Sequence, residues 1–165
     1  MTVRTILTWP DKRLRTKCEE VTEVTDEVRR IWDDMIETMD AMPGVGLGAP
    51  QIGVMQRLAV VDTSEARNKR IRLANPVVID ASAILNVHEE ASPCLSGVSA
   101  KVSRPRGVKV RYMDEAGAVV ERDFVGLDAT SVQHQIDHLD GKMYFDRLSK
   151  MKRDMLIRRA RKMNG

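Results

Sequence analysis

The sequence contains little of what stabilises a secreted protein or inserts one into a membrane. Only two cysteines, Cys18 and Cys94, occur among its 165 residues, which is too few for a disulfide framework. The opening stretch, MTVRTILTWPDKR, lacks the apolar core of a signal peptide. No run approaches the roughly 18 apolar residues of a membrane-spanning helix. We therefore expect a cytoplasmic protein that has no disulfide partner and no membrane contact.

The chain also lacks a strong net charge. Its 27 basic and 24 acidic residues leave a formal charge of +3, which alone does not indicate nucleic-acid binding. The charge is uneven, however, because the last segment of the chain is almost entirely basic. Its charged residues are Lys150, Lys152, Arg153, Arg158, Arg159, Arg161 and Lys162, against the single acid Asp154. This segment predicts a helix that contacts an anionic surface such as RNA, or else a solvated helical tail.

The length favours a single domain spanning residues 1–165, large enough to bury roughly 70% of its unfolded surface. Its clearest helix is predicted after Thr25, which suits an N-cap, and before Pro43-Gly44, which would end it. Between these signals, apolar residues recur at the spacing of one helix face. They are Val28, Ile31, Trp32, Met35, Met39 and Met42.

Downstream, the pattern changes to short segments rich in Val, Ile and Leu. These segments, at residues 57–62, 70–80, 83–90, 107–114 and 118–125, predict strands. The strands should be mostly antiparallel, because the gaps between them are too short for parallel crossovers. Helical spacing returns in LDATSVQHQIDHL, with Asp128 as candidate N-cap and Asp140-Gly141 as the end. The predicted fold class is α+β, with a helix at the C-terminus.

The candidate chemistry centres on SVQHQIDHLDG, residues 131–141. His134 and His138 lie four residues apart, so on a helix both side chains project from the same face. Two imidazoles in this arrangement can bind one metal ion and leave room for further ligands. Two helix histidines with separate roles are the alternative. The residues alone leave two candidates for a third ligand, His88 and Cys94.

Two further stretches carry candidate functional residues. Cys94 lies in ASPCLSGV, where its thiolate could bind Zn²⁺ or Fe²⁺, or where it could simply be a buried, inert thiol. The segment GVGLGAPQIG, residues 44–53, predicts a tight glycine-rich loop that lets a ligand approach the backbone. Gln51 follows this loop with an amide able to donate to an oxyanion. A plain connector is the alternative.

Taken together, the three stretches resemble the peptide deformylase family. That family carries a glycine-rich loop ending in Gln, a Glu-Gly-Cys-Leu-Ser segment and a His-Glu-x-x-His helix, in this order. The corresponding stretches here are GVGLGAPQ, SPCLS and HQIDH. The opening ILTWPDKRLRTKCEEV also resembles the family's N-terminal segment, so that the similarity covers nearly the whole chain.

The resemblance implies antiparallel strands packed around a central helix that carries both histidines. It implies one divalent metal ion, usually Fe²⁺ with Zn²⁺, Ni²⁺ or Co²⁺ as substitutes, held by Cys94, His134 and His138. The implied reaction removes the formyl group from N-formyl-methionyl peptides leaving the ribosome. Gln51 and the backbone N–H of Leu95 would stabilise the oxyanion, and the segment at Val45 and Gly46 would pair with the substrate backbone. In bacterial members the basic C-terminal helix contacts the ribosome, which gives the basic segment a specific role.

The sharpest departure from the family is Gln135, which stands where the family has its general base, Glu. An amide has nearly the shape of a carboxylate but cannot accept the proton of an attacking water molecule. General acid–base catalysis contributes roughly 10²–10⁴-fold to rates, so we expect at least that loss. Asp137 is an unsuitable substitute, because it should pair with Arg104. Glu89 and Glu90 could serve only if the loop that precedes Cys94 is reshaped.

Other departures surround the same motifs. Ser92 and Pro93 replace the family's Glu and Gly, and Gly48 replaces its usual Ala. Glu90 and Thr130 occupy positions that often line an apolar pocket for the substrate's methionine. Three hypotheses remain open: a deformylase-like hydrolase of weak or altered activity, an inactive paralogue that binds nascent chains or the ribosome, and a hydrolase for another formyl or amide substrate.

Overall fold

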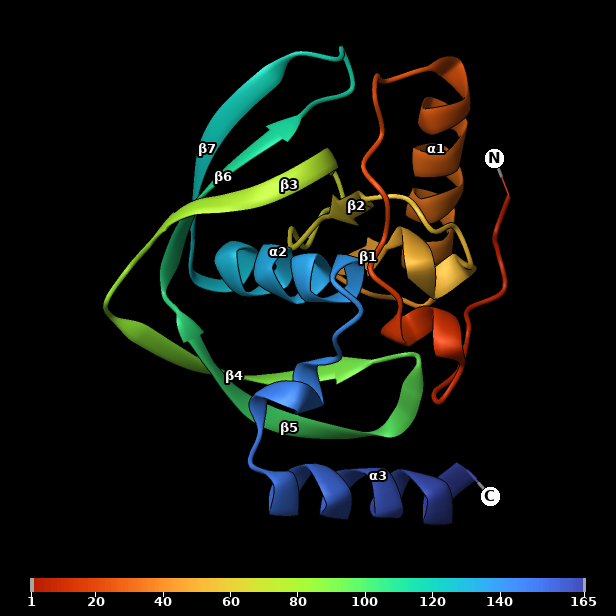
Figure 1. Ribbon diagram of the computed structural model, residues 1–165, viewed down its shortest axis with the longest axis vertical. Helices are drawn as coiled ribbons and strands as arrows, with labels where there is room; N and C mark the ends of the chain where they lie inside the picture. Colours follow the sequence, from red (N-terminus) through yellow and green to blue (C-terminus); the bar gives the residue numbers. More distant parts are fainter. Residues whose placement is uncertain (1, 165) are drawn as a thin grey trace.

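The computed structural model describes residues 2–164, which form three α-helices, three short 3₁₀ helices and seven strands (Figure 1). The order is η1 Lys12–Arg15, α1 Asp26–Ala41, β1 Gly46–Gly48, η2 Ala49–Ile52, β2 Leu58–Val61, β3 Ile71–Ala81, β4 Leu85–Ser92, β5 Leu95–Pro105, β6 Gly107–Met113, β7 Val119–Val125, α2 Gly126–Leu139, η3 Tyr144–Arg147 and α3 Lys150–Asn164. The predicted α+β class with a C-terminal helix is confirmed.

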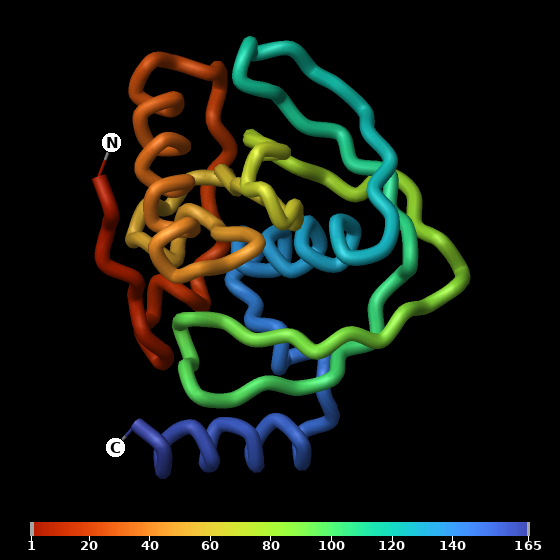
Figure 2. Tube along the Cα trace, turned by 180° about the vertical axis from the view of Figure 1, so that it is seen from behind, coloured from red at the N-terminus to blue at the C-terminus, as the bar shows by residue number. Residues whose placement is uncertain are grey.

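The strands form two antiparallel sheets that lie on either side of α2. One sheet has five strands in the order β1-β2-β3-β6-β7, and the other is the hairpin of β4 and β5. Every pairing between these strands is antiparallel, as predicted. Seen from the front and from behind, α2 runs between the two sheets (Figures 1 and 2). Strand β1 is an edge strand, so one side of its backbone has no strand partner.

The first helix follows the sequence prediction closely. The Thr25 hydroxyl accepts a hydrogen bond from the Val28 backbone N–H at 3.2 Å, which satisfies one free donor of the first turn. Trp32, Met35 and Met39 are fully buried and pack in the cluster that includes residues of β1 and β2. The helix therefore supports the edge of the five-stranded sheet from outside.

Helix α2 is buried on nearly all sides, which explains its mixture of apolar and polar residues. Its apolar residues Ala129, Val132 and Leu139 pack in one cluster with residues of β2, β3, β6 and β7. The predicted N-cap at Asp128 is wrong: the helix begins at Gly126, and the Asp128 carboxylate instead accepts from the Thr63 hydroxyl. The predicted end is confirmed, with Gly141 in the left-handed region at φ 77°.

Two strands were not predicted. Strand β1 lies inside the glycine-rich stretch that the sequence suggested to be a loop, and its Gly46 pairs with Val61 of β2. Strand β5 begins directly after Cys94, and a tight turn joins it to β4, in which Ser92 faces Leu95. Both corrections matter for function, because they place GVGLG on the edge of the five-stranded sheet and PCLS at the turn of the β4–β5 hairpin.

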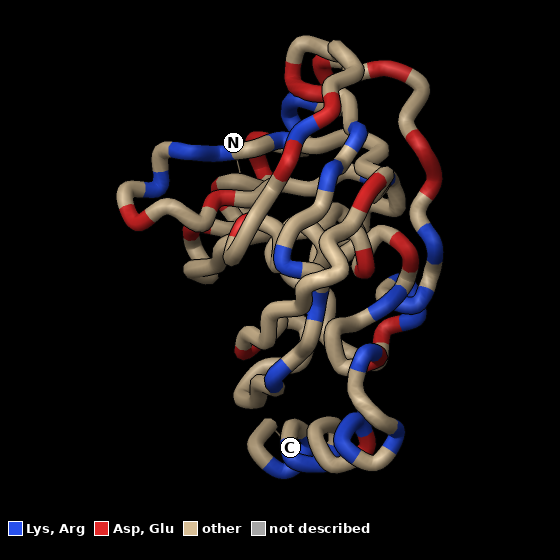
Figure 3. Tube along the Cα trace, turned by 90° about the vertical axis from the view of Figure 1, so that its left-hand side faces the viewer, with Lys and Arg blue, Asp and Glu red and all other residues tan. Residues whose placement is uncertain are grey.

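Helix α3 packs along β5 and leaves its basic side chains in solvent. Leu156 and Ala160 are buried in one cluster with Val98 and Val102 of β5. Many positions along the C-terminal helix are Lys or Arg, drawn in blue in Figure 3. The exposed basic residues are Lys150, Lys152, Arg158, Arg159, Arg161 and Lys162. Across residues 2–164, no helix combines the length and apolar character needed to span a membrane.

Candidate active site

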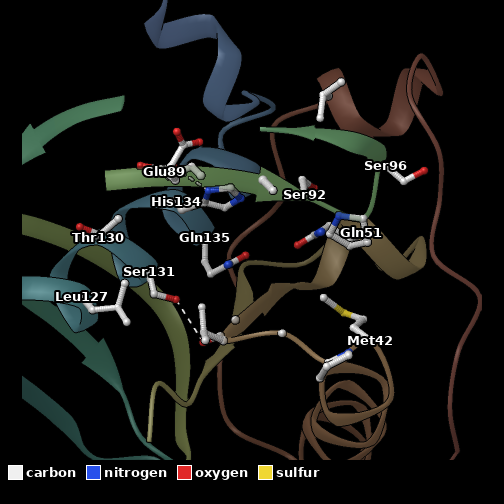
Figure 4. A pocket seen from close by; sticks show the side chains of 18 of the residues that line it. Met42, Gln51, Glu89, Ser92, Ser96, Leu127, Thr130, Ser131, His134 and Gln135 are labelled. Atoms are coloured by element: carbon white, nitrogen blue, oxygen red, sulfur yellow. Dashed lines mark hydrogen bonds and ion pairs between the residues drawn. The ribbon is translucent and has the colours of Figure 1, made fainter. Parts of the chain in front are cut away.

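A hollow lies between the edge of β1, the turn joining β4 to β5, and α2. Its volume is about 570 Å³, and it is lined by residues 42–46, 89–93 and 96–98 together with Gln51 and one side of α2. Figure 4 shows His134 and Gln135 projecting from α2 and Gln51 approaching from η2. Each of the three stretches singled out in the sequence therefore contributes to one cavity.

The two histidines face each other through the same ring atom. His134 Nε2 and His138 Nε2 lie 3.2 Å apart, and both side chains are buried. Two imidazole nitrogens that bind one tetrahedral ion at about 2.0–2.1 Å would be separated by about 3.3 Å. Burial, reinforced by the neighbouring His134, holds the pKa of His138 well below its usual value of 6.5. The ring is therefore neutral at physiological pH, which is the form that binds a metal.

His134 is held from behind by a buried acid. Its Nδ1 lies 2.8 Å from Glu90 Oε1, and the same carboxylate receives two hydrogen bonds from Arg104. Burial alone would raise the pKa of Glu90, but the hydrogen bonds from Arg104 and His134 outweigh it and lower the net pKa. Arg104 also binds Asp137 at 2.9 Å, which confirms the predicted pair.

Glu90 was the functional residue whose contacts the sequence did not reveal. Although it lies on the cavity wall as expected, both of its oxygens are engaged by Arg104 and His134 rather than free for catalysis. The available signal was its position in a strand, close to a basic residue of the paired strand. The register places Glu90 opposite Ala100 and Arg104 opposite Asn86, so the Glu90–Arg104 contact follows from the packing of the two side chains and not from direct cross-strand pairing.

Cys94 lies beside Gln51 rather than in a completed ligand set. The Gln51 amide accepts from the Gly48 N–H at 2.8 Å and donates from Nε2 to Cys94 Sγ at 3.5 Å. Burial raises the pKa of the Cys94 thiol, while contacts with Gln51 and Ser92 oppose the rise. Among residues 2–164, no three His, Cys, Asp or Glu side chains are already arranged as metal ligands.

The other candidate third ligand, His88, lies elsewhere. Its Nδ1 is 2.8 Å from the Thr130 hydroxyl, so this histidine is paired with the wall of the cavity. Both cysteines are free thiols. The structure therefore places His134 beside His138 and Cys94 beside Gln51. His88 contacts neither histidine and is instead hydrogen-bonded to Thr130.

The histidine pair offers two nitrogen ligands for a divalent transition metal, and among residues 2–164 no third His, Cys, Asp or Glu ligand lies beside it. Imidazole and thiolate are ligands that Fe²⁺ and Zn²⁺ both accept. Next to the histidine pair, the buried Oε1 atom of Gln135 has no hydrogen-bond partner. A buried polar atom without a partner requires a group to satisfy it, such as a water molecule held in the site.

Gln135 packs tightly against β1. A Cβ atom added to Gly46 would lie 2.5 Å from Gln135 Nε2 and 2.7 Å from the Ser131 hydroxyl, so a larger residue there would force these side chains to move. The Ser131 hydroxyl also donates to the Val45 carbonyl at 3.1 Å. Leu95, the other predicted oxyanion residue, has its side chain buried at the start of β5. Gln135 thus lies between the histidine pair and the sheet edge.

The fold and the site together define a class. It is the class of α+β proteins in which antiparallel sheets enclose a helix that carries a His-x-x-x-His pair. More specifically, the chain belongs to the polypeptide deformylase family, whose pattern matches residues 3–154.

Relatives of known sequence and structure agree with this assignment. A peptide deformylase of Rhodopseudomonas palustris strain BisB5 is 45% identical over 166 residues, covering 98% of this chain and 95% of its own. One from Hydrogenovibrio crunogenus is 43% identical over 157 residues, covering 95% and 92%. The crystal structure of peptide deformylase from Ehrlichia chaffeensis in complex with actinonin has a TM-score of 0.92 and 36% identity, covering 99% of this chain and 98% of that one.

Proposed function

We propose that this chain binds N-formyl-methionyl peptides in the cavity and releases their formyl group as formate, at a rate limited by Gln135. Family membership over residues 3–154 supports the reaction. The observation that carries the rate limit is the position of Gln135, a neutral amide that lines the cavity beside the histidine pair.

Cys94, His134 and His138 are the proposed ligands of one divalent ion, Fe²⁺ in the cell and Zn²⁺, Ni²⁺ or Co²⁺ as substitutes. The donor types and the 3.2 Å separation of the two Nε2 atoms support this assignment. The bound ion supplies Lewis acidity, which polarises the formyl carbonyl and lowers the pKa of water.

The free edge of β1 supports a binding mode for the peptide. An extended peptide can pair with an unpaired sheet edge through its backbone, as a further strand. Val45 and Gly46 lie at that edge, and both line the cavity. The backbone of the substrate would therefore lie along β1 with its formyl end directed toward His134 and Gln135.

Gln51 and the Leu95 backbone N–H are the proposed oxyanion donors. The Gly48 N–H fixes the orientation of the Gln51 amide, so its Nε2 is directed to the Cys94 side of the cavity. A preoriented donor of this kind can be worth ~10²–10³-fold in kcat when it meets the developing charge.

Proton transfer is the step for which the site lacks a group. Gln135 can accept or donate a hydrogen bond, but it cannot take a proton from water and pass it to the leaving nitrogen. Two acids near Gln135 are already paired: Glu90 with Arg104 and His134, and Asp137 with Arg104 and Arg147. Glu89 also lines the cavity, and its side chain is exposed. We therefore expect activity lower by at least ~10²–10⁴-fold than that of the Gln135→Glu variant.

Two observations favour alternatives to a slow deformylase. The exposed basic side of α3 fits a module that contacts the ribosome and holds nascent chains without hydrolysing them. The polar Glu90 and Thr130 on the cavity wall fit a hydrolase for another formyl or amide substrate.

One assay separates these functions. Formate release from a formyl-Met dipeptide is measured with the wild-type chain and with Gln135→Glu, each loaded with Ni²⁺ or Fe²⁺. Slow wild-type turnover that Gln135→Glu increases supports the proposal. Dipeptide binding without turnover in either protein supports the binding module, and a failure of both proteins to bind or cleave it supports a different substrate. Cys94→Ala with unchanged metal content would contradict the ligand assignment.

A further inference from the structure

The last turn of α3 is attached to the rim of the cavity. Residues 96–98 of β5 line one side of that cavity. At the end of α3, Asn164 Nδ2 donates to the Ser96 backbone carbonyl at 2.7 Å, and Asn164 Oδ1 accepts from the Ser96 hydroxyl at 3.2 Å. Figures 1 and 2 show α3 running beside β5 toward the C-terminus. A single side chain thus joins two segments that are 68 residues apart in sequence.

Strand pairing is interrupted in this part of the rim. The register of the hairpin shifts between Glu90 and Ser92, where β4 contributes only Ala91. Across from it, β5 contributes residues 96–99 before regular pairing resumes at Ala100. The additional residues of such a bulge lack a cross-strand partner, so their conformation depends on other contacts. The last turn of α3 supplies contacts of this kind.

Met163 packs against the backbone of Gly97 at the same place. Gly97 has a φ of 88°, in the left-handed region that favours glycine. A Cβ atom built on it would lie 3.4 Å from Met163 Cε and 3.5 Å from Met163 Sδ, so the methionine side chain covers this residue closely. Asn164 Nδ2 also donates to the Ala160 carbonyl at 2.9 Å, which ties the asparagine side chain to its own helix. The rim segment is therefore anchored to α3.

We propose that Asn164 is a positioning residue for substrate binding, which holds Ser96 and Gly97 in the conformation that receives the peptide. The proposal rests on the proposed function, because that function places the peptide in this cavity. Asn164 is exposed and lies outside the cavity wall, so it acts through Ser96 and does not touch the peptide. It also lies beyond the family pattern, which ends at residue 154. The role therefore follows from the contacts of this chain and not from a family motif.

Such a role affects the binding of the peptide and not the cleavage of its formyl group. The rim would contact the body of the peptide, which does not change during the reaction. Loosening the rim should therefore raise KM and leave kcat unchanged. A net hydrogen bond is worth roughly 2–10-fold in an equilibrium constant, so we expect KM to rise roughly 3–10-fold when both bonds to Ser96 are lost.

Asn164→Ala tests the proposal, with Ser149→Ala as the matched control. Asn164→Ala removes both hydrogen bonds to Ser96 at the end of α3. The Ser149 hydroxyl accepts from the Lys152 N–H at 3.3 Å, so Ser149→Ala weakens the opposite end of the same helix and leaves the rim intact.

The first readout is the kcat and KM of formate release from a formyl-Met tripeptide, for the wild type and both variants loaded with Ni²⁺. Asn164→Ala should raise KM with kcat unchanged, and Ser149→Ala should change neither value. An unchanged KM in Asn164→Ala, or an equal rise in Ser149→Ala, would overturn the proposal.

A second readout does not depend on hydrolysis. Amide hydrogen exchange, followed by NMR in the metal-free protein, reports how firmly Gly97 and Val98 are held. Asn164→Ala should speed exchange at both residues, whereas Ser149→Ala should leave it unchanged. No change at these residues in a folded Asn164→Ala protein would show that α3 does not hold the rim. Faster exchange without any formate release would support the attachment of the rim and contradict only the proposed reaction.

Discussion

Replacing Gly46 with alanine should disrupt the packing between β1 and α2. The added Cβ would lie 2.5 Å from Gln135 Nε2 and 2.7 Å from the Ser131 hydroxyl, well inside normal contact distance. Overpacking of this kind costs about 1–3 kcal/mol. In a chain of this size each kcal/mol lowers Tm by about 2–4 °C, so we expect a fall of about 2–12 °C.

The matched control is Gly107→Ala, also in a strand. Its added Cβ would lie 3.4 Å from the Phe124 carbonyl and 3.5 Å from Val125, which is ordinary contact. Thermal unfolding followed by circular dichroism compares the two variants. A combination of Gly46→Ala with Gln135→Ala should recover part of the loss, because the closest contact is removed. If Gly46→Ala is no more destabilising than Gly107→Ala, the tight packing of Gln135 against β1 is wrong.

Three further predictions concern stability. The metal-free protein should lose stability as pH falls below about 6.5, because unfolded His138 then takes up a proton that the folded form, with its lowered pKa, excludes. Urea midpoints should therefore fall from pH 7.5 to pH 5, and a flat profile over this range would contradict the His138 shift. The lowered pKa of Glu90 adds a further loss below about pH 4.5, where unfolded Glu90 takes up a proton. Arg104→Met should cost about 3–5 kcal/mol in urea unfolding, because it leaves buried Glu90 without its main partner; a cost below that of an exposed pair would refute this. Thr25→Ala should cost about 1 kcal/mol through loss of the α1 N-cap, and no change in the urea midpoint would show the cap to be unimportant.

Patterns of neighbouring residues in the sequence were sufficient to predict the first helix and most of the strands. The apolar spacing after Thr25 predicted α1, and the alternation of short apolar segments with turn residues predicted five strands. Strand β1 escaped prediction because it is only three residues long, two of them glycine, and exists through pairing with β2. Intrinsic strand preference has little influence on such a segment.

In the site too, contacts between residues close in sequence could be predicted, whereas contacts between distant residues could not. The helical spacing of His134 and His138 predicted their convergence, since both lie on one helix. The contacts of Glu90 could not be predicted in this way, because Arg104 is 14 residues away in sequence and His134 is 44 residues away. They depend on the register of the β4–β5 hairpin and on its packing against α2.

The most direct test of the central claim is the ratio of kcat values for Gln135→Glu and wild type, at saturating formyl-Met dipeptide and equal metal occupancy. If Gln135 deprives the site of its proton acceptor, the ratio should be at least ~10²–10⁴. A wild-type chain that turns over as fast as Gln135→Glu, with the variant folded and fully loaded, would contradict the account.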